Sequence, residues 1–124
     1  MLDINFLKQY NVDTDTAIEL FGDVGVYNET CQDFLDGIDE KLSELKKYKE
    51  QSDMANYAIY AHSIKSDARY LGFTKLAEIA YQHEMEGKAN NVYFVSNNYD
   101  EFVKETNRII YNFKAKFSFC FNIF

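Results

Sequence analysis

The sequence predicts an all-α fold: an up-down-up-down four-helix bundle with one or two short N-terminal helices before it. Apolar residues recur at three- and four-residue steps through four long segments, which is the periodicity of amphipathic helices. The 124 residues include no proline, the residue that helix interiors tolerate least. The links between the segments are short, and four amphipathic helices joined in this way pack most simply as antiparallel neighbours.

Two short amphipathic segments open the chain, at residues 3–10 and 14–21, and are expected to cover one end or one flank of the bundle. The first long helix follows over about 25–48, with Asp23 as its N-cap. One apolar stripe runs along this helix through Tyr27, Cys31, Phe34, Ile38, Leu42 and Leu45. Gly37 falls in the middle of the helix, where a glycine costs about 1 kcal/mol relative to alanine.

The second and third long helices have recognisable ends. The second is expected over 53–71, because Asp53 can cap its first turn and Gly72 can adopt the left-handed conformation that often follows a last turn. The third is expected over about 74–89, with Thr74 as its N-cap. We expect it to close at Gly87 and the asparagine pair that follows.

The fourth long helix begins within residues 92–97 and reaches about 117. Its apolar stripe is Tyr99, Phe102, Val103, Thr106, Ile109, Ile110, Phe113 and Phe117. Residues 118–124 form an aromatic tail, which packs on the bundle, marks the place where a longer chain is cut or, as a less favoured alternative, forms a dimerisation patch. The length fits a single domain over residues 1–124.

Charge and cysteine content exclude several classes of function. A formal net charge of −7 gives no basic excess to displace the counterions of a nucleic acid or to bind an anionic membrane. Cys31 and Cys120 are far apart and lack ligand-like spacing, so neither a disulfide framework nor a zinc site is expected. No apolar run reaches the ~20 residues that span a bilayer, and the N-terminus lacks the features of a signal peptide. We therefore expect a cytoplasmic protein with reduced thiols, and nothing in the sequence requires more than a monomer.

The helix over 53–71 has two different faces when its residues are placed at 100° steps. One face is apolar and consists of Tyr57, Tyr60, Ala61, Ile64, Ala68 and Leu71. The opposite face consists of Ala55, Ala58, Ile59, His62, Lys65, Ser66 and Arg69. This second face combines one histidine, two cations further along the helix, and a small apolar rim made by Ala55, Ala58 and Ile59.

Such a face is suited to phosphoryl transfer. An exposed imidazole can attack phosphorus through a ring nitrogen. The transfer then needs chiefly in-line positioning and stabilisation of charge, which Lys65 and Arg69 can supply. Ser66 is small, so a partner's active site can approach His62. The apolar rim lets that partner dock without removing many charges from water. Taken alone, the same spacing also describes an ordinary solvated helix face.

Residues 61–72 read AHSIKSDARYLG and resemble the signature of histidine-containing phosphotransfer (HPt) domains. The family pattern is alanine-histidine, any residue, an aliphatic residue, lysine and glycine, with leucine-glycine closing the helix. The residues that match are Ala61, His62, Ile64, Lys65, Leu71 and Gly72. The resemblance extends over residues 3–115, upstream through Phe21, Gly22, Asp23, Tyr27 and Phe34, and downstream through Phe73, Leu76, Ala80 and Glu84.

The resemblance implies a role for each residue of the site. His62 would accept the phosphoryl group, and Lys65 would hold or screen it. Glu84 stands where family members commonly carry a glutamate or glutamine beside the imidazole. It would accept the proton on Nδ1 and leave Nε2 free as the nucleophile; the alternative is an ordinary surface carboxylate. Ser66 replaces the family's usual glycine, which should preserve access to His62 and leaves partner preference or transfer rate open to change.

The second histidine, His83, lies on the inner stripe of its helix and is expected to be a partly buried structural residue. Several tyrosines at helical spacing are expected to be core and boundary residues, among them Tyr57, Tyr60, Tyr70 and Tyr81. Two histidines without a ligand constellation make a poor metal site, so no bound metal is expected.

Three functions stay open on the sequence. The first is a phosphocarrier, not itself an enzyme, that takes a phosphoryl group from the receiver domain of a response regulator or hybrid sensor kinase and passes it to another receiver. It would need no cofactor: no glycine-rich phosphate loop is visible, and the receiver would bring Mg²⁺. The second is the phosphoacceptor module of a chemotaxis-type histidine kinase. The third is a helical protein-interaction module without phosphotransfer.

Overall fold

The computed structural model describes the backbone of residues 24–123 and the side chains of residues 26–113. Four helices account for almost all of this part: α3 (Val24–Glu50), α4 (Met54–Leu71), α5 (Thr74–Lys88) and α6 (Val92–Ile123). The predicted all-α class is therefore confirmed for the described residues. The short helices expected at 3–10 and 14–21, and the expected cap at Asp23, lie outside them.

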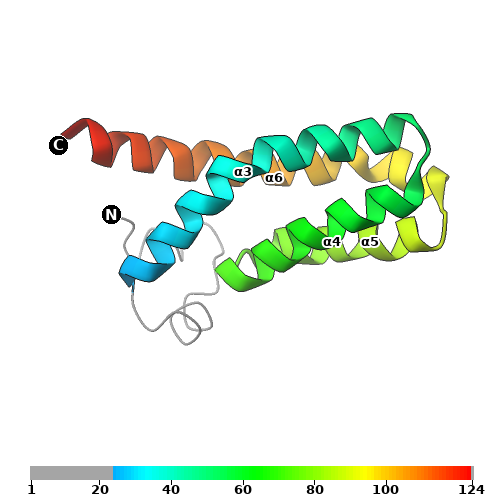
Figure 1. Cartoon of the computed structure of the whole chain (residues 1–124), viewed down its shortest axis with the longest axis horizontal. Helices are drawn as coiled ribbons and strands as arrows, with labels where there is room; N and C mark the ends of the chain where they lie inside the picture. Colours follow the sequence, from blue (N-terminus) through cyan, green and yellow to red (C-terminus); the bar gives the residue numbers. More distant parts are fainter. Residues whose placement is uncertain (1–23, 124) are drawn as a thin grey trace.

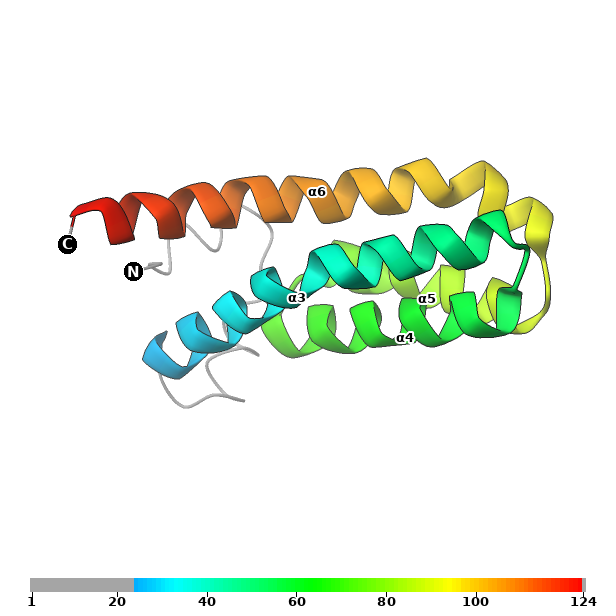
Figure 2. The ribbon, with the colours of Figure 1, turned by 45° about the horizontal axis from the view of Figure 1, so that its top comes forward.

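The helices run along roughly one direction, except for the first half of α3, which diverges from the others, and each helix turns back on the one before it (Figure 1). α4 packs against α3 and α5, and α6 packs against α5 and α3, so the four enclose a shared core. Figure 2 shows α6 continuing past the ends of the other helices. It extends beyond the expected end near residue 117 to Ile123. None of the described helices is both long and apolar enough to cross a membrane.

Local sequence explains both ends of α4, as predicted. The Asp53 side chain accepts a hydrogen bond from the backbone N–H of Asn56, which satisfies one of the free donors of the first turn. Gly72 follows the last residue with φ of 83°, a left-handed conformation that costs glycine little. The site-bearing helix is thus firmly terminated on both sides.

The predicted cap of α5 is wrong. Thr74 is the first residue of the helix, and the residue at the N-cap is Phe73, whose side chain makes no capping hydrogen bond. Phe73 is buried and makes edge-on ring contacts with Phe34 and Phe113. The N-cap position of α5 is therefore occupied by a residue that packs in the core and not by one that caps the helix. Asn91 does cap the next helix, because its side chain accepts a hydrogen bond from a backbone N–H in the first turn of α6.

The core is built from the predicted stripes. In α3 and α4 their members are buried apart from Leu42 and Tyr60, which are partly buried against the cluster. The stripe of α6 contributes Phe102, Thr106, Ile109 and Phe113, which are all buried. Burial of these side chains is the main favourable term for such a bundle, at roughly 25 cal/mol per Å² of apolar surface.

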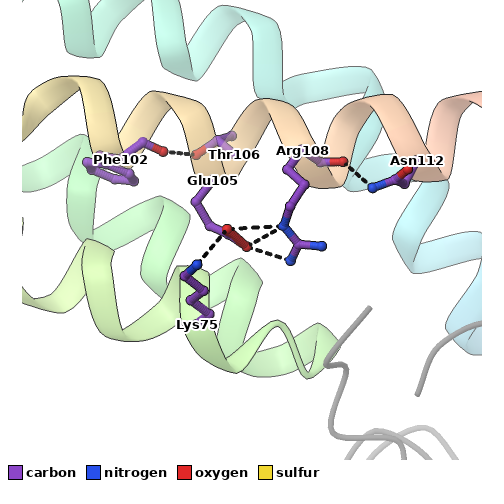
Figure 3. A network of polar contacts seen from close by, with 6 residues as sticks. All are labelled: Lys75, Phe102, Glu105, Thr106, Arg108 and Asn112. Carbon is purple, nitrogen blue, oxygen red and sulfur yellow. Dashed lines mark hydrogen bonds and ion pairs between the residues drawn. The ribbon is translucent and has the colours of Figure 1, made fainter. Parts of the chain in front are cut away.

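A buried carboxylate joins α5 to α6 (Figure 3). Glu105 accepts hydrogen bonds from Arg108 Nε at 2.9 Å and Nη2 at 2.5 Å. Lys75, at the start of α5, places its Nζ 3.7 Å from the other oxygen. A carboxylate inside the protein needs such partners because removing an unpaired charge from water is costly, and the contact with Lys75 adds one polar link between the two helices.

Two glycines inside helices meet different surroundings. Gly87 was expected to close α5 but lies within it, at a point where α4 passes close by. A Cβ at Gly87 would lie 3.2 Å from Ala58 Cβ and 3.3 Å from the Met54 carbonyl oxygen. At Gly37, in α3, a Cβ would meet nothing within 4 Å.

This contrast gives a matched pair of substitutions. Gly37→Ala is expected to raise the free energy of unfolding by about 0.5–1 kcal/mol, because alanine favours the helix and fits the space. Gly87→Ala gives the same gain in helix propensity, but its Cβ crowds Ala58 Cβ and the Met54 carbonyl oxygen. Overpacking of this kind costs about 1–3 kcal/mol. The net result is a loss of stability in urea unfolding followed by circular dichroism. Equal gains in both variants would contradict the close approach of α4 and α5.

His83 is more deeply buried than expected. Its Nδ1 lies 2.8 Å from the Tyr57 hydroxyl oxygen, and its ring packs against Phe94 and Phe102. Burial lowers the pKa of His83 to about 4, against a smaller opposing effect of a hydrogen bond to the backbone of Asn98. The imidazole is therefore neutral and structural at neutral pH.

The lowered pKa predicts acid sensitivity. The unfolded chain binds this proton near pH 6.5 and the folded chain only near pH 4, so unfolding takes up a proton between these values. The free energy of unfolding is expected to fall from pH 6.5 to 4 by about 3 kcal/mol on this account. His83→Gln, which keeps a polar partner for Tyr57 but does not titrate, is expected to flatten that slope in urea unfolding at a series of pH values. An unchanged slope would contradict the assignment.

Candidate functional site

The predicted phosphoacceptor lies in the middle of α4, with the His62 side chain 56% exposed. Ser66 and Arg69 are exposed further along the same helix, and Ala55 and Ile59 are exposed before it. A partner protein therefore has open access to the imidazole, with a small serine and apolar side chains around it.

Two residues of the predicted exposed face are buried instead. Lys65 is 8% exposed and Ala58 is 4% exposed, because α5 packs along this side of α4. Ala58 packs against Gly87, and Lys65 reaches across to Glu84. A helical wheel describes one helix in isolation and does not say on which side the next helix lies.

Glu84, on α5, is the centre of the polar cluster. Its Oε2 lies 2.6 Å from Nδ1 of His62, and its Oε1 accepts a hydrogen bond of 2.5 Å from Lys65 Nζ. Lys88 Nζ lies 3.1 Å from the same Oε2. Glu84 is 1% exposed, which excludes the reading of an ordinary surface carboxylate.

The cations around Glu84 keep it ionised. Burial by itself raises the pKa of this carboxyl, but the hydrogen bonds from Lys65, Lys88 and His62 outweigh it and lower the pKa to about 2. A carboxylate can only accept, so a neutral imidazole beside it carries its proton on Nδ1. The lone pair is then on Nε2, which is the arrangement that a nucleophilic histidine requires.

Lys88 was not anticipated from the sequence. The available signal is the four-residue spacing from Glu84, since a glutamate and a lysine placed this way meet on a helix surface. Tyr81, expected to be a boundary residue, also lies at the site. Its ring centroid is 5.5 Å from Lys65 Nζ and 5.5 Å from Arg69 Cζ.

A hollow of about 540 Å³ opens beside the imidazole. It is lined by Ala55, Ala58, Ile59, His62, Glu84, Gly87, Lys88 and Asn90. Apart from Ile59, the apolar residues that line it are alanines and a glycine, which leave the space open. Within the described part of the chain, no group of three or more histidines, cysteines or acidic residues is placed to hold a metal ion.

Comparison with protein-family models identifies the family. The model for the Hpt domain matches residues 26–103, which is well over half of the chain and includes all of α4 and α5. The chain belongs to the Hpt domain family. No curated protein and no solved structure matches it.

Membership confirms the predicted resemblance and gives the general activity. Hpt domains are phosphocarriers in two-component signalling rather than enzymes in their own right. Their partners are, in general, receiver domains and histidine kinases. The match covers the whole polar cluster of this Hpt domain, from His62 on α4 to Lys88 at the end of α5.

Proposed function

We propose that this Hpt domain accepts a phosphoryl group on Nε2 of His62 from a receiver-domain aspartate and relays it to another response regulator. One observation carries the proposal: an exposed imidazole has its Nδ1 2.6 Å from a buried carboxylate that hydrogen bonds keep charged. This pairing orients the ring and selects the tautomer with a free Nε2.

The chemical step follows from the same contacts. The Nε2 lone pair attacks phosphorus, the bond between phosphorus and the aspartate oxygen breaks, and the aspartate leaves as a carboxylate. The imidazole gains positive charge as it attacks, and Glu84 stabilises that charge through Nδ1–H, as the carboxylate of a catalytic triad does. In this proposal, Lys65 offsets the negative charge of the phosphoryl oxygens. Reversal of these steps delivers the group to a second receiver.

The surroundings of His62 support docking of a receiver domain. Ala55, Ile59 and Ser66 are exposed around the imidazole, and Ala58 lines the hollow beside it. The proposal takes the chain as a cytoplasmic monomer with one domain over residues 1–124, folded as an up-down-up-down bundle. The domain itself needs no cofactor or metal, since the receiver supplies Mg²⁺.

The test is direct transfer of label. The full chain is incubated with receiver domains phosphorylated by a labelled donor, and the label on the chain is tested for stability. A phosphohistidine is lost in acid and survives in base. Absence of such label with several candidate receivers would contradict the proposal, and labelling only by an ATP-binding kinase domain would favour the chemotaxis-type module instead.

A further inference from the structure

Tyr81 occupies a distinct position on α5. It lies one turn before Glu84, whereas Lys88 lies one turn after, so the two flank the carboxylate along the helix. Tyr81 is 42% exposed, and two cations of α4, Lys65 and Arg69, lie over its ring at equal distances. Lys65 and Arg69 are themselves one turn apart on α4. A single aromatic ring on one helix therefore contacts two successive cations on the other.

The contact with Lys65 restricts an ammonium group that the chemistry needs. An ammonium has three N–H donors, and Glu84 receives one of them in the 2.5 Å hydrogen bond. The negative face of the Tyr81 ring attracts the same charge, but it contains no oxygen acceptor that competes for the remaining donors. The ring thus holds Lys65 beside Glu84 and leaves donors for phosphoryl oxygens.

The contact with Arg69 has a different consequence. Arg69 lies seven residues after His62, which is about 10 Å along the helix axis, whereas Lys65 is one turn nearer and is the cation closer to the phosphoryl group. Arg69 is exposed, and its Cζ lies 5.5 Å from the ring centroid, a contact that favours one position of the guanidinium on the docking face. A planar guanidinium pairs well with a carboxylate.

We propose that Tyr81 is a positioning residue of this site: its ring holds Lys65 for the phosphoryl group and Arg69 for a carboxylate on the docking receiver. The inference rests on the proposed phosphotransfer function. It assigns Tyr81 two separable effects, one on the transfer step through Lys65 and one on receiver binding through Arg69.

The test compares Tyr81→Phe, which keeps the ring, with Tyr81→Leu and Tyr81→Met, which remove it. Transfer from a phosphorylated receiver is followed in single turnovers at increasing receiver concentration, giving a maximal rate and a half-saturating concentration. Tyr81→Phe is expected to match the wild type in both. Tyr81→Leu and Tyr81→Met are expected to lower the maximal rate about three-fold and raise the half-saturating concentration about three-fold, the size of a partly exposed cation–π contact.

A second background separates the two effects. In Arg69→Gln, loss of the Tyr81 ring is expected to leave the half-saturating concentration unchanged while still lowering the maximal rate. The inference would be overturned if Tyr81→Phe and Tyr81→Leu had the same maximal rate and half-saturating concentration. It would also be overturned if loss of the ring raised the half-saturating concentration as much in the Arg69→Gln background as in the wild type. Thermal unfolding of each variant shows whether the fold is intact. A wild-type chain without label contradicts the proposed function, whereas a labelled wild type with an unaffected Tyr81→Leu contradicts only the role of Tyr81.

Discussion

His62→Gln is expected to abolish labelling of this Hpt domain by a phosphorylated receiver. Glutamine has a similar size and can hydrogen-bond to Glu84, but its amide nitrogen has no lone pair that attacks phosphorus. The label is measured after gel separation at several time points, with the receiver in excess. Because His62 is 56% exposed, the free energy of unfolding should change by no more than about 0.5 kcal/mol.

The second histidine provides a matched control for this experiment. His83 is buried and bonded to Tyr57, so no receiver can reach it without unfolding the domain. His83→Gln is expected to retain the label wherever it remains folded. Base-stable label that persists in His62→Gln and disappears in His83→Gln would show that His83 is the phosphoacceptor and would overturn the proposed site.

Glu84→Ala is expected to lower the free energy of unfolding by about 3–5 kcal/mol, the usual effect of breaking a buried ion pair by removing one partner. The substitution leaves Lys65, which is 8% exposed, without its carboxylate. It also removes the acceptor at Nδ1 of His62, so the transfer rate should fall together with stability. Urea unfolding at pH 7 and the labelling assay measure the two effects separately.

A double variant distinguishes the structural from the chemical contribution. Lys65→Met combined with Glu84→Leu replaces both charges by apolar side chains, which is often close to neutral for stability. It is expected to recover most of the stability lost in Glu84→Ala while remaining defective in transfer. If Glu84→Ala alone were as stable as the wild type, the ion pair at the centre of the site would not be formed in solution.

The extent of the helices was largely predictable, because the apolar period and the ends of α4 are local properties. Asp53 and Gly72 act as expected through their own side-chain and backbone chemistry. Thr74 and Gly87 do not, because their environments depend on neighbours that the local sequence does not specify. Phe73 is drawn into the core at the N-cap of α5, and Gly87 serves the approach of α4 rather than the end of its own helix.

The site was predictable only in part. Helical spacing places Lys65 and His62 on one side of α4, but the burial of Lys65 depends on where α5 packs. The 22-residue separation between His62 and Glu84 has no local periodicity, so only the family resemblance connected them. Lys88 and Tyr81 join the site because they lie one turn to either side of Glu84, which matters only once Glu84 is known to face α4.

Two lysines share one carboxylate beside His62, and this stoichiometry sets the electrostatic balance of the carrier. With the imidazole neutral, Lys65, Lys88 and Glu84 together bear a single positive charge. A phosphoryl group brings about 1.5 to 2 negative charges on its oxygens, but the ring, which keeps its proton on Nδ1, gains one positive charge, so the phosphorylated cluster stays close to neutral. Neither form is far from electroneutral, so the cluster resists neither loading nor unloading. Under the proposed function, the direction of transfer would then be decided by the two receivers.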